Sequence, residues 1–175
     1  MNFIKKFFLF LITILPLYAN NFQNIKTLEA NFIQTIQNPS GTKVYYEGKL
    51  YIKEPNLIKW EYKKPFQKYV YIKKYTITII EPELEQVIIT KIDKEINILA
   101  LLKKAKKISQ NLYTSRFNNI DFNLTLHNNR LKNISYKDEL ENNVVIEFTE
   151  LEQNHIIEDK IFKFQIPYHY DLIKK

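Results

Sequence analysis

The fold is decided by residues 48–65, GKLYIKEPNLIKWEYKKP, in which two runs alternate apolar and polar residues and meet at residues 54–56. The apolar positions of the two runs are Leu50, Ile52, Ile58, Trp60 and Tyr62. Period-two alternation buries one face of a strand and leaves the other in water. Pro55 has no N–H for a strand ladder and therefore belongs at the turn. The stretch predicts a hairpin whose apolar face carries Trp60, the one Trp of the chain.

Similar alternating runs fill most of the remaining chain. We expect strands over residues 42–53, 56–63, 67–81, 84–92, 112–117, 120–127, 130–137, 144–150 and 156–166. Asn38-Pro39-Ser40-Gly41 is a turn signal, and Lys73-Lys74 marks a hairpin inside the third run. The chain has two Gly, so Asn pairs at 118–119, 128–129 and 142–143 are expected to make turns. This pattern predicts a mainly β single domain: an open antiparallel barrel or strongly curved sheet, with helices.

One helix is expected, over residues 93–111. Ile96, Leu99 and Leu102 share its apolar face, and Asp93 can cap its start. Four lysines at positions 103, 104, 106 and 107 form either a docking or lipid-headgroup patch or a solvated helix face. Residues 22–37 fit both a helical and a strand pattern. The family resemblance described below implies a short helix to about Leu28 followed by a strand.

The N-terminal residues 1–19 read as a secretory signal. Lys5 and Lys6 precede an apolar run over residues 7–17, and Ala19 is a plausible last residue before cleavage. The alternative is an uncleaved anchor, although the run is short of the ~20 residues that span a bilayer. The chain has no Cys, so it carries neither a disulfide nor the lipid-accepting residue of a bacterial lipoprotein. We expect an exported protein, either periplasmic or secreted, with a single domain over residues 20–175.

Composition argues against nucleic-acid binding and against catalysis. The formal net charge is +7, but the chain has only Arg116 and Arg130 to supply guanidinium forks. The three His are scattered without metal-ligand spacing, and two Gly cannot build a phosphate loop. The alternating Glu81, Glu83 and Glu85 flank a Pro and are explained as edge charge. We therefore expect no enzyme, no cofactor and no metal.

The ordered set of positions in this region resembles one family. The pattern is Gly48, Leu50, Ile52, Pro55, Trp60 and Pro65, preceded by Phe32 and Gln34 and followed by Pro82, Gln86 and the run FKFQIP at 162–167. This spacing is similar to that of the periplasmic outer-membrane lipoprotein carriers (LolA), and the resemblance covers nearly all of the chain after residue 19.

The resemblance implies an open antiparallel β-barrel lidded by helices, which shields acyl chains of lipoproteins between the inner and outer membranes. The implied partners of this monomeric carrier are acylated lipoproteins, an inner-membrane lipoprotein-releasing ABC transporter and an outer-membrane acceptor. The expected acyl-chain cavity is lined by Phe32, Val44, Tyr46, Leu50, Ile52, Ile58, Trp60 and Tyr62. Ile96, Leu99 and Leu102 would form the underside of the lid. The alternative function is a lipid-binding or envelope-stress sensing module on the same scaffold.

The chain departs from the family at one position. Many members carry Arg directly before the Pro that corresponds to Pro55, where it ties the lid to barrel carbonyls, whereas this chain has Glu54. An ionised carboxylate cannot donate hydrogen bonds to carbonyls. The latch is therefore either built differently or absent, and we expect a looser lid. Separately, Asp121 to Thr125 match both the ordinary and an acidic bacterial N-glycosylation acceptor pattern, with Asn123 expected to face outward.

Overall fold

The computed structural model describes residues 22–175, so the expected signal and its cleavage site at Ala19 lie outside the described part. In the described range the chain forms one twelve-stranded sheet in the order β12-β6-β5-β4-β3-β2-β1-β11-β10-β9-β8-β7. The strands are β1 (Thr27–Gln37), β2 (Lys43–Lys53), β3 (Leu57–Lys64), β4 (Lys68–Lys73), β5 (Thr76–Glu81), β6 (Gln86–Lys91), β7 (Lys106–Lys107), β8 (Leu112–Phe117), β9 (Ile120–His127), β10 (Arg130–Lys137), β11 (Asn143–Gln153) and β12 (Asp171–Lys174).

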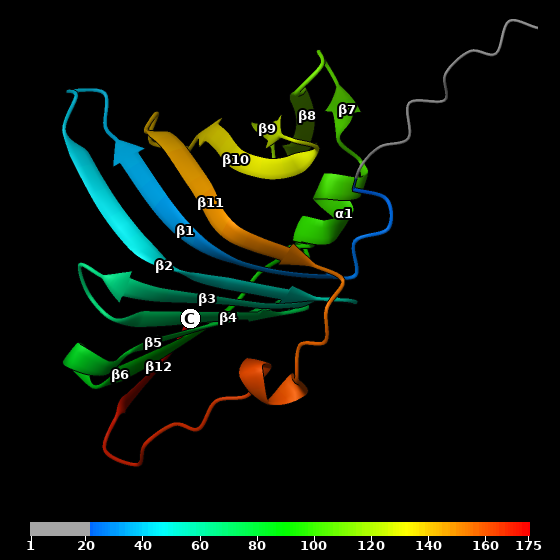
Figure 1. Cartoon of the computed structure of the whole chain (residues 1–175). Helices are drawn as coiled ribbons and strands as arrows, with labels where there is room; N and C mark the ends of the chain where they lie inside the picture. The colour runs from blue at the N-terminus through cyan, green and yellow to red at the C-terminus, as the bar shows by residue number, and fades with distance from the viewer. Residues whose placement is uncertain (1–21) are drawn as a thin grey trace, which may run out of the picture.

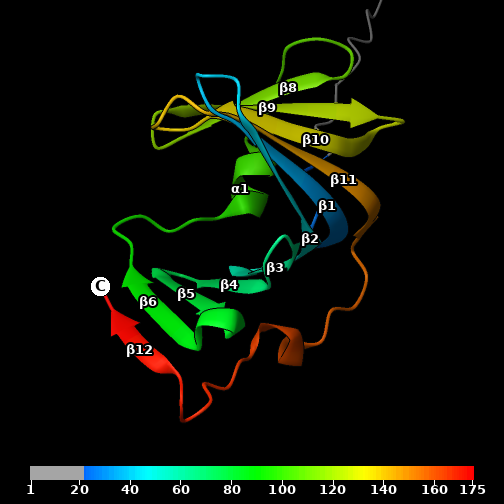
Figure 2. The ribbon, with the colours of Figure 1, turned by 90° about the vertical axis from the view of Figure 1, so that its left-hand side faces the viewer.

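The sheet is open and strongly curved, as the alternation predicted. All neighbouring strands are antiparallel except β12, which pairs in parallel with β6. In Figures 1 and 2, β3 to β6 form a floor, β2, β1 and β11 bend upward from it, and β10, β9 and β8 lie above it. Helix α1 (Ile98–Lys103) lies on the concave side of this curve. Within residues 22–175, no helix has the length and apolar character that a bilayer crossing requires.

Several strands and turns match the sequence prediction. The predicted strands 112–117, 120–127 and 130–137 are β8, β9 and β10 residue for residue. The Asn pairs at 118–119 and 128–129 have φ values between 48° and 64°, the left-handed region that Asn tolerates. The third Asn pair is a correction, because the left-handed residue there is Glu141, with φ 63°. The Asp138 carboxylate accepts from the backbone N–H groups of Leu140 and Asn142, so an aspartate organises that turn.

The predicted helix over residues 93–111 is wrong in length. Only α1 is helical, and it begins after Asn97, whose side chain accepts a hydrogen bond from the Ala100 N–H. Soon after α1, Lys106 and Lys107 pair with β8 and complete the edge of the sheet. Strand pairing at an open edge therefore prevails over the helical spacing of the apolar residues. The expected helix before Leu28 is also not formed in the described range, where residues 22–24 make a turn and β1 begins at Thr27.

The predicted strand over residues 156–166 is wrong. This segment contains the short 3-10 helix η2 (Asp159–Phe162) and irregular chain. The strand β12, which the sequence did not indicate, begins only at Asp171. A second 3-10 turn, η1 (Pro82–Leu84), joins β5 to β6. The apolar residues of the C-terminal segment cover the convex face of the sheet instead of joining a ladder. The Phe164 ring, for example, lies 4.9 Å from the Tyr71 ring.

Two groups of buried residues lie on opposite faces of the sheet. The main core occupies the concave side and includes Phe32, Leu50, Ile52, Ile58, Leu99, Leu102 and Phe148. A second group, Ile80, Val87 and Ile157, is buried but lies outside the main core. In both views of the ribbon, residues 154–170 run along the outside of β3 to β6, where this second group lies.

Candidate functional site: a covered apolar cavity

The concave face of β1, β2 and β3 carries a cluster of aromatic rings. The ring of Phe32 lies 5.0 Å from that of Trp60 and 5.2 Å from that of Tyr62, both in edge-to-face arrangements. The strand register places Gly48 directly opposite Phe32. A Cβ atom at Gly48 would lie 2.7 Å from Phe32 Cζ and 2.1 Å from the Glu61 carbonyl oxygen. The bare backbone at Gly48 therefore makes the room that the Phe32 ring occupies.

An apolar cavity of about 190 Å³ lies between this concave face and α1. Its lining consists of Leu50, Trp60, Ile96, Asn97, Ile98, Leu101, Phe117, Phe122, Ile134, Tyr136, Ile146 and Phe148. Ligand pockets for drug-sized molecules measure roughly 300–1,000 Å³, and an apolar cavity of about 150 Å³ suffices to hold benzene. The cavity seen here therefore has room for part of one alkyl chain while α1 is in place.

Helix α1 is the cover of this cavity. Leu99 and Leu102 are 3% and 0% exposed and anchor the helix in the core, whereas Ile98 and Leu101 face the cavity. Because α1 has only six residues, its own backbone hydrogen bonds cannot hold it as an isolated helix. Its position therefore depends on these anchors and on polar contacts with neighbouring elements.

Four polar contacts tie α1 and its flanks to the sheet. Lys103 on α1 forms an ion pair with Glu54, and Asn97 Nδ2 donates to the Pro55 carbonyl oxygen at 3.3 Å. Asn56 Nδ2 donates to the Glu95 carboxylate, and Ser115 Oγ donates to the Leu101 carbonyl oxygen at 2.9 Å. Three of these contacts converge on the β2–β3 turn at residues 54–56. The latch is thus built differently from the family Arg: Glu54 accepts from the helix, and a helix-side amide donates to the barrel carbonyl.

The residues expected to line the cavity occupy three kinds of position. Leu50 and Trp60 line it, and so does Ile96, which was expected on the lid. Phe32, Ile52 and Ile58 are at most 2% exposed and form the packed floor next to the cavity. Tyr62 and Tyr46 extend the aromatic cluster away from α1, with their rings 5.8 Å apart, and Val44 beyond them is 43% exposed. The expected set therefore spans a path from the solvent-exposed end of the concave face to the cavity.

The opposite wall of the cavity was missed by sequence reasoning. It consists of Phe117, Phe122, Ile134, Tyr136, Ile146 and Phe148, contributed by β8 to β11. The signal was present, because apolar residues alternate in these predicted strands just as they do in residues 48–65. The curvature that turns this wall toward Trp60 cannot be read from alternation alone.

Polar side chains interrupt the apolar surface at one place. Gln34 is buried on β1, and its Oε1 accepts a hydrogen bond from the Tyr62 hydroxyl at 3.3 Å. Burial raises the pKa of Tyr62 to about 12, with smaller contributions from the phenols of Tyr136 and Tyr46. The ammonium group of Lys68 lies 4.9 Å from the centre of the Tyr62 ring and 5.9 Å from that of Tyr46. These groups lie on the side of Trp60 that is away from α1.

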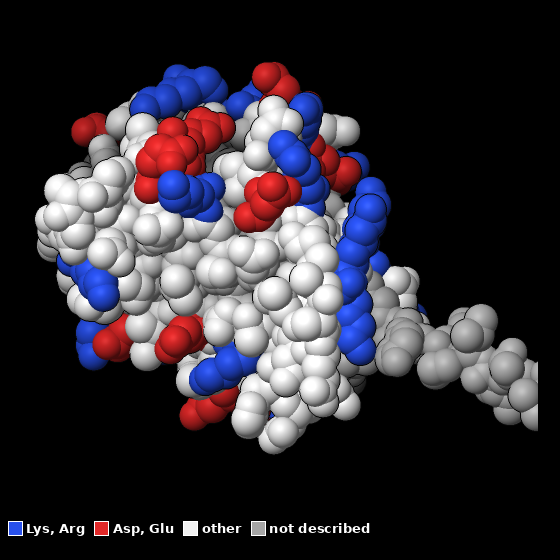
Figure 3. Space-filling view, turned by 90° about the horizontal axis from the view of Figure 1, so that it is seen from above, with Lys and Arg blue, Asp and Glu red and all other residues white. Residues whose placement is uncertain are grey.

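Charged residues are mixed over the surface. In Figure 3, basic and acidic side chains interleave around much of the visible face, with a row of basic residues along one edge and uncharged side chains across the middle. Among the four lysines expected on the helix, Lys103 is paired with Glu54, and Lys104, Lys106 and Lys107 are exposed. Asn123 is exposed on β9, as its alternation predicted. Among the described residues, no group of three or more His, Cys, Asp or Glu could hold a metal ion.

Comparison with known proteins identifies the family. The family model described as "Outer membrane lipoprotein carrier protein LolA" matches residues 23–121, more than half of the chain. A Campylobacter jejuni protein named "Outer-membrane lipoprotein carrier protein" is 34% identical over 97% of this chain and 99% of its own length. A Wolinella succinogenes protein of the same name is 30% identical over 88% of this chain and 90% of its own length.

A solved structure shows the same fold. The crystal structure of an uncharacterised conserved protein from Thermus thermophilus superposes with a TM-score of 0.54 at 10% sequence identity, covering 89% of this chain and 94% of its own. This likeness concerns the fold alone. The match to the family model and the identity to the two relatives place the chain in the LolA family of outer-membrane lipoprotein carrier proteins.

Proposed function

We propose that this protein is a periplasmic carrier that binds the acyl chains of lipoproteins released from the inner membrane and conveys them to the outer membrane. The observation that carries the proposal is the apolar cavity of about 190 Å³ that α1 covers. The names of the two relatives support a carrier over the alternative of a lipid-binding or stress-sensing module on the same scaffold. The proposed activity is binding and release, without a covalent step.

The energetics favour a carrier whose cover opens. Each buried methylene contributes about 0.8 kcal/mol, so burying ten methylenes of acyl chain contributes about 8 kcal/mol. The Glu54–Lys103 ion pair is partly exposed, with side chains 39% and 27% accessible. Such pairs contribute only about 0–1 kcal/mol. Displacing α1 also exposes its anchors Leu99 and Leu102, which costs about 1.5–3 kcal/mol for each side chain. Burial of ten or more methylenes offsets both the anchors and the polar ties, so cargo can displace the helix and enlarge the cavity.

The remaining parts of the proposal concern export and partners. Residues 1–19 act as the signal, with cleavage near Ala19, and the mature monomer works in the periplasm. It receives acylated lipoproteins from a lipoprotein-releasing ABC transporter in the inner membrane and delivers them to an acceptor at the outer membrane. Residues expected to contact the acyl chains are Phe32, Val44, Tyr46, Leu50, Ile52, Ile58, Trp60 and Tyr62, with Ile96, Leu99 and Leu102 under the lid.

The test is capture of lipoproteins in the periplasm. The tagged mature protein should co-purify with acylated lipoproteins, and Ile98→Glu and Leu101→Glu, which place a charge against the cavity from α1, should abolish capture. Thr149→Glu is the matched control. Thr149 is exposed on β11 and does not line the cavity, so this substitution adds the same charge away from the cavity. Capture of lipoproteins by the control but not by the α1 variants is expected.

Two results would contradict the proposal. One is a wild-type protein that retains no acylated lipoprotein when it is purified from cells that export them. The other is equal retention by all three glutamate variants. Mass spectrometry of the co-purified material distinguishes the alternative function, since a phospholipid or another small lipid without any lipoprotein would favour a lipid-binding module.

A further inference from the structure

The concave face contains a small polar cluster whose members share one property: each has a hydrogen-bonding group next to an otherwise apolar path. We call Gln34, Tyr46, Tyr62 and Tyr136 the polar cluster. Gln34 is 8% exposed, and its Oε1 accepts from the Tyr62 hydroxyl. Among residues 22–175, no protein group accepts a hydrogen bond from its Nε2, so this amide has donors to offer to a ligand.

The position of the polar cluster suits the polar end of an acyl chain. The Tyr62 ring lies 6.4 Å from the ring of Trp60, which lines the cavity, and Tyr136 lines the cavity from the opposite wall. Tyr46 lines a separate surface hollow of about 290 Å³ together with Phe66, Lys68 and Leu84. The cluster thus lies between an open hollow and the covered apolar cavity. A chain whose tail lies under α1 would have its carbonyl end here.

The chemistry of the cluster selects acceptors. An amide NH₂ and a phenol donate hydrogen bonds, and the raised pKa of Tyr62 keeps its hydroxyl protonated throughout the physiological range. Ester and amide carbonyl oxygens accept hydrogen bonds and cannot donate them. The Tyr62 hydroxyl already donates to Gln34 Oε1 and so orients the amide, whose NH₂ group is left to donate to a ligand. An alkyl chain offers no acceptor, so a site filled only by alkyl chain would leave the Gln34 NH₂ unpaired in an apolar environment.

We propose that the polar cluster binds the ester or amide carbonyl groups that join acyl chains to their head group, and so fixes how far each chain enters the cavity. This inference rests on the proposed carrier function and adds a recognition element to it. The ligand chemistry is an ester- or amide-linked acyl chain, which either a lipoprotein N-terminus or a glycerophospholipid can supply.

The test compares lipids that differ only in the carbonyl. A short-chain diacyl glycerophospholipid and its dialkyl-ether analogue have the same tails and head group, and calorimetric titration measures the affinity for each as monomers. We expect wild-type protein to bind the ester lipid about three- to tenfold more tightly than the ether lipid, the size of one or two neutral hydrogen bonds. Tyr62→Phe and Gln34→Met should each bring that ratio of affinities close to one, because the ether lipid has no carbonyl group for the polar cluster to bind.

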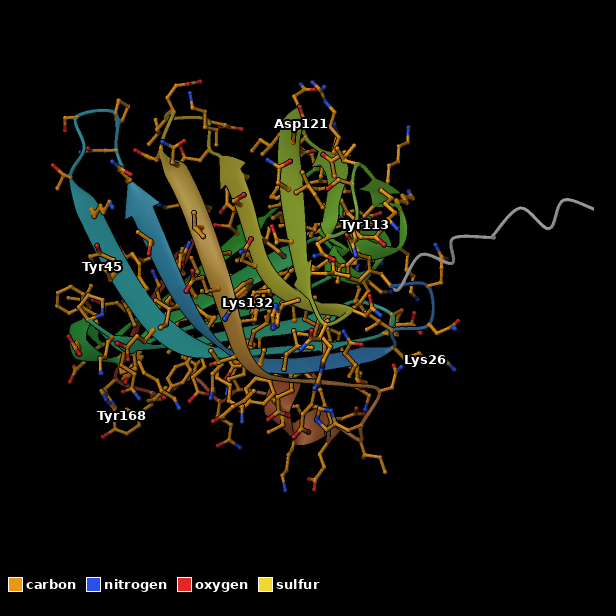
Figure 4. All side chains as sticks on the ribbon, turned by 45° about the horizontal axis from the view of Figure 1, so that its top comes forward. Lys26, Tyr45, Tyr113, Asp121, Lys132 and Tyr168 are labelled. Atoms are coloured by element: carbon orange, nitrogen blue, oxygen red, sulfur yellow. The ribbon has the colours of Figure 1, made fainter. Side chains whose placement is uncertain are left out.

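The control is Tyr45→Phe, which removes the same hydroxyl from the residue next to Tyr46. Tyr45 is 57% exposed, and in Figure 4 its side chain points outward from β2. It should keep the full preference for the ester lipid. Thermal unfolding of all variants checks that the two near-isosteric substitutions preserve the fold, and Gln34→Met keeps the test informative if Tyr62→Phe does not fold.

The outcomes separate the two proposals. Equal affinity of the wild type for ester and ether lipids, or an undiminished preference in both Tyr62→Phe and Gln34→Met, overturns the polar-cluster inference while leaving the carrier intact. If the wild type binds neither of the two lipids and no triacylated lipopeptide, both the carrier function and the polar-cluster inference are contradicted. A lipopeptide bound more tightly than the diacyl lipid, with the excess lost in Tyr62→Phe, identifies the lipoprotein N-terminus as the source of the carbonyls.

Discussion

The two faces of the sheet are each covered by a segment that is not part of their main ladder, but the two covers differ in what they hide. On the concave face, α1 covers a cavity of about 190 Å³. On the convex face, the C-terminal segment covers Ile80 and Val87, which are 7% and 0% exposed. The comparison teaches that the two covers lose different contacts when they move. Moving α1 exposes Leu99 and Leu102, but Ile98 and Leu101 face the cavity and lose few contacts. The cover over a filled core loses the burial of everything beneath it.

The tethers differ as well. The C-terminal segment is held by Lys53, which donates to Asp159 at 2.6 Å and to the Ile157 carbonyl oxygen at 2.7 Å, and by the four-residue pairing of β12 with β6. The Thr27 hydroxyl donates to the His155 carbonyl oxygen at 2.7 Å. Helix α1 has no strand pairing of its own and depends on side-chain contacts. We therefore expect α1 to be the more mobile of the two covers.

The largest effect tests whether the concave face is tightly packed away from the cavity. Gly48→Ala places a methyl group against the Glu61 carbonyl oxygen and the Phe32 ring, so we expect a loss of unfolding free energy of about 3 kcal/mol or more. Gly41→Ala is the control, because Gly41 has open space around it and φ 91°, and backbone strain there costs about 1 kcal/mol. Urea unfolding measures both. Equal losses of unfolding free energy for Gly48→Ala and Gly41→Ala would mean that the concave face around Phe32 is not tightly packed.

The next effect compares the two covers directly. Ile80→Ala removes methyl groups from the filled convex core and should cost about 3 kcal/mol in unfolding free energy. Leu101→Ala enlarges a cavity that already exists, so it loses fewer contacts, and we expect about 1 kcal/mol. The measurement is again urea unfolding. A cost for Leu101→Ala as large as that for Ile80→Ala would remove the distinction between a cover over a cavity and a cover over a core.

A smaller effect concerns the latch of α1. Glu54→Arg restores the residue that many family members carry, but here it would face Lys103 and replace attraction by repulsion. We expect amide hydrogen exchange in residues 98–103 to become about threefold to fivefold faster, equivalent to about 1 kcal/mol or less for a partly exposed pair. The charge-swapped pair Glu54→Arg with Lys103→Glu should restore the slow exchange. Slower exchange in Glu54→Arg alone would show that Arg reaches the carbonyls in its family role.

The smallest effect concerns acid. Burial of Glu29 opposes its ionisation, but hydrogen bonds from Lys49 and His155 outweigh burial and hold its pKa below 4.5. A hydrogen bond from Lys53 lowers the pKa of Asp159 below 3.8. A carboxylate whose pKa is lowered by folding stabilises the folded protein above its unfolded pKa, and this contribution is lost as the pH falls through its folded pKa.

The convex cover should therefore weaken below pH 4.5, because His155 and Asp159 both belong to the C-terminal segment. Glu29→Gln should lower the melting temperature at pH 7. At pH 3 the melting temperatures of the variant and the wild type should differ by less than at pH 7. The effect is less than about 1 kcal/mol, since Glu29 is partly exposed. Glu139→Gln, at an exposed turn position, is the control. A melting-temperature difference that is the same at pH 3 and pH 7 would contradict the prediction.

Sequence reasoning located the sheet well and its covers poorly, for a physical reason. Alternation between two turn signals is a local property, so β8, β9 and β10 and the hairpin at residues 54–56 could be predicted to the residue or nearly so. The C-terminal end of α1 depends on the pairing of Lys106 and Lys107 with β8. This pairing is a tertiary contact, which local sequence does not reveal. The same holds for residues 156–166, whose apolar side chains pack on a sheet face formed by distant strands.

The site shows the same division. Residues of the aromatic cluster on β1 to β3 could be predicted because they share one face of neighbouring strands. Ile98, Leu101 and the wall contributed by β8 to β11 meet Trp60 only through the curvature of the sheet. The reversed latch was foreseen in part, because Glu54 cannot donate to a carbonyl, but the donor that reaches Pro55 in its place, Asn97, becomes visible only in three dimensions.

The two edge strands of the sheet affect how readily one molecule associates with another. A long, flat, unpaired strand at the edge of a sheet can pair with a strand of another chain and so lead to aggregation. Here the outermost strands, β7 and β12, have two and four residues, and both carry lysine. Short edge strands that carry lysine disfavour edge-to-edge pairing between two molecules. Neither end of the sheet therefore offers a long strand to which a second copy of the chain could add.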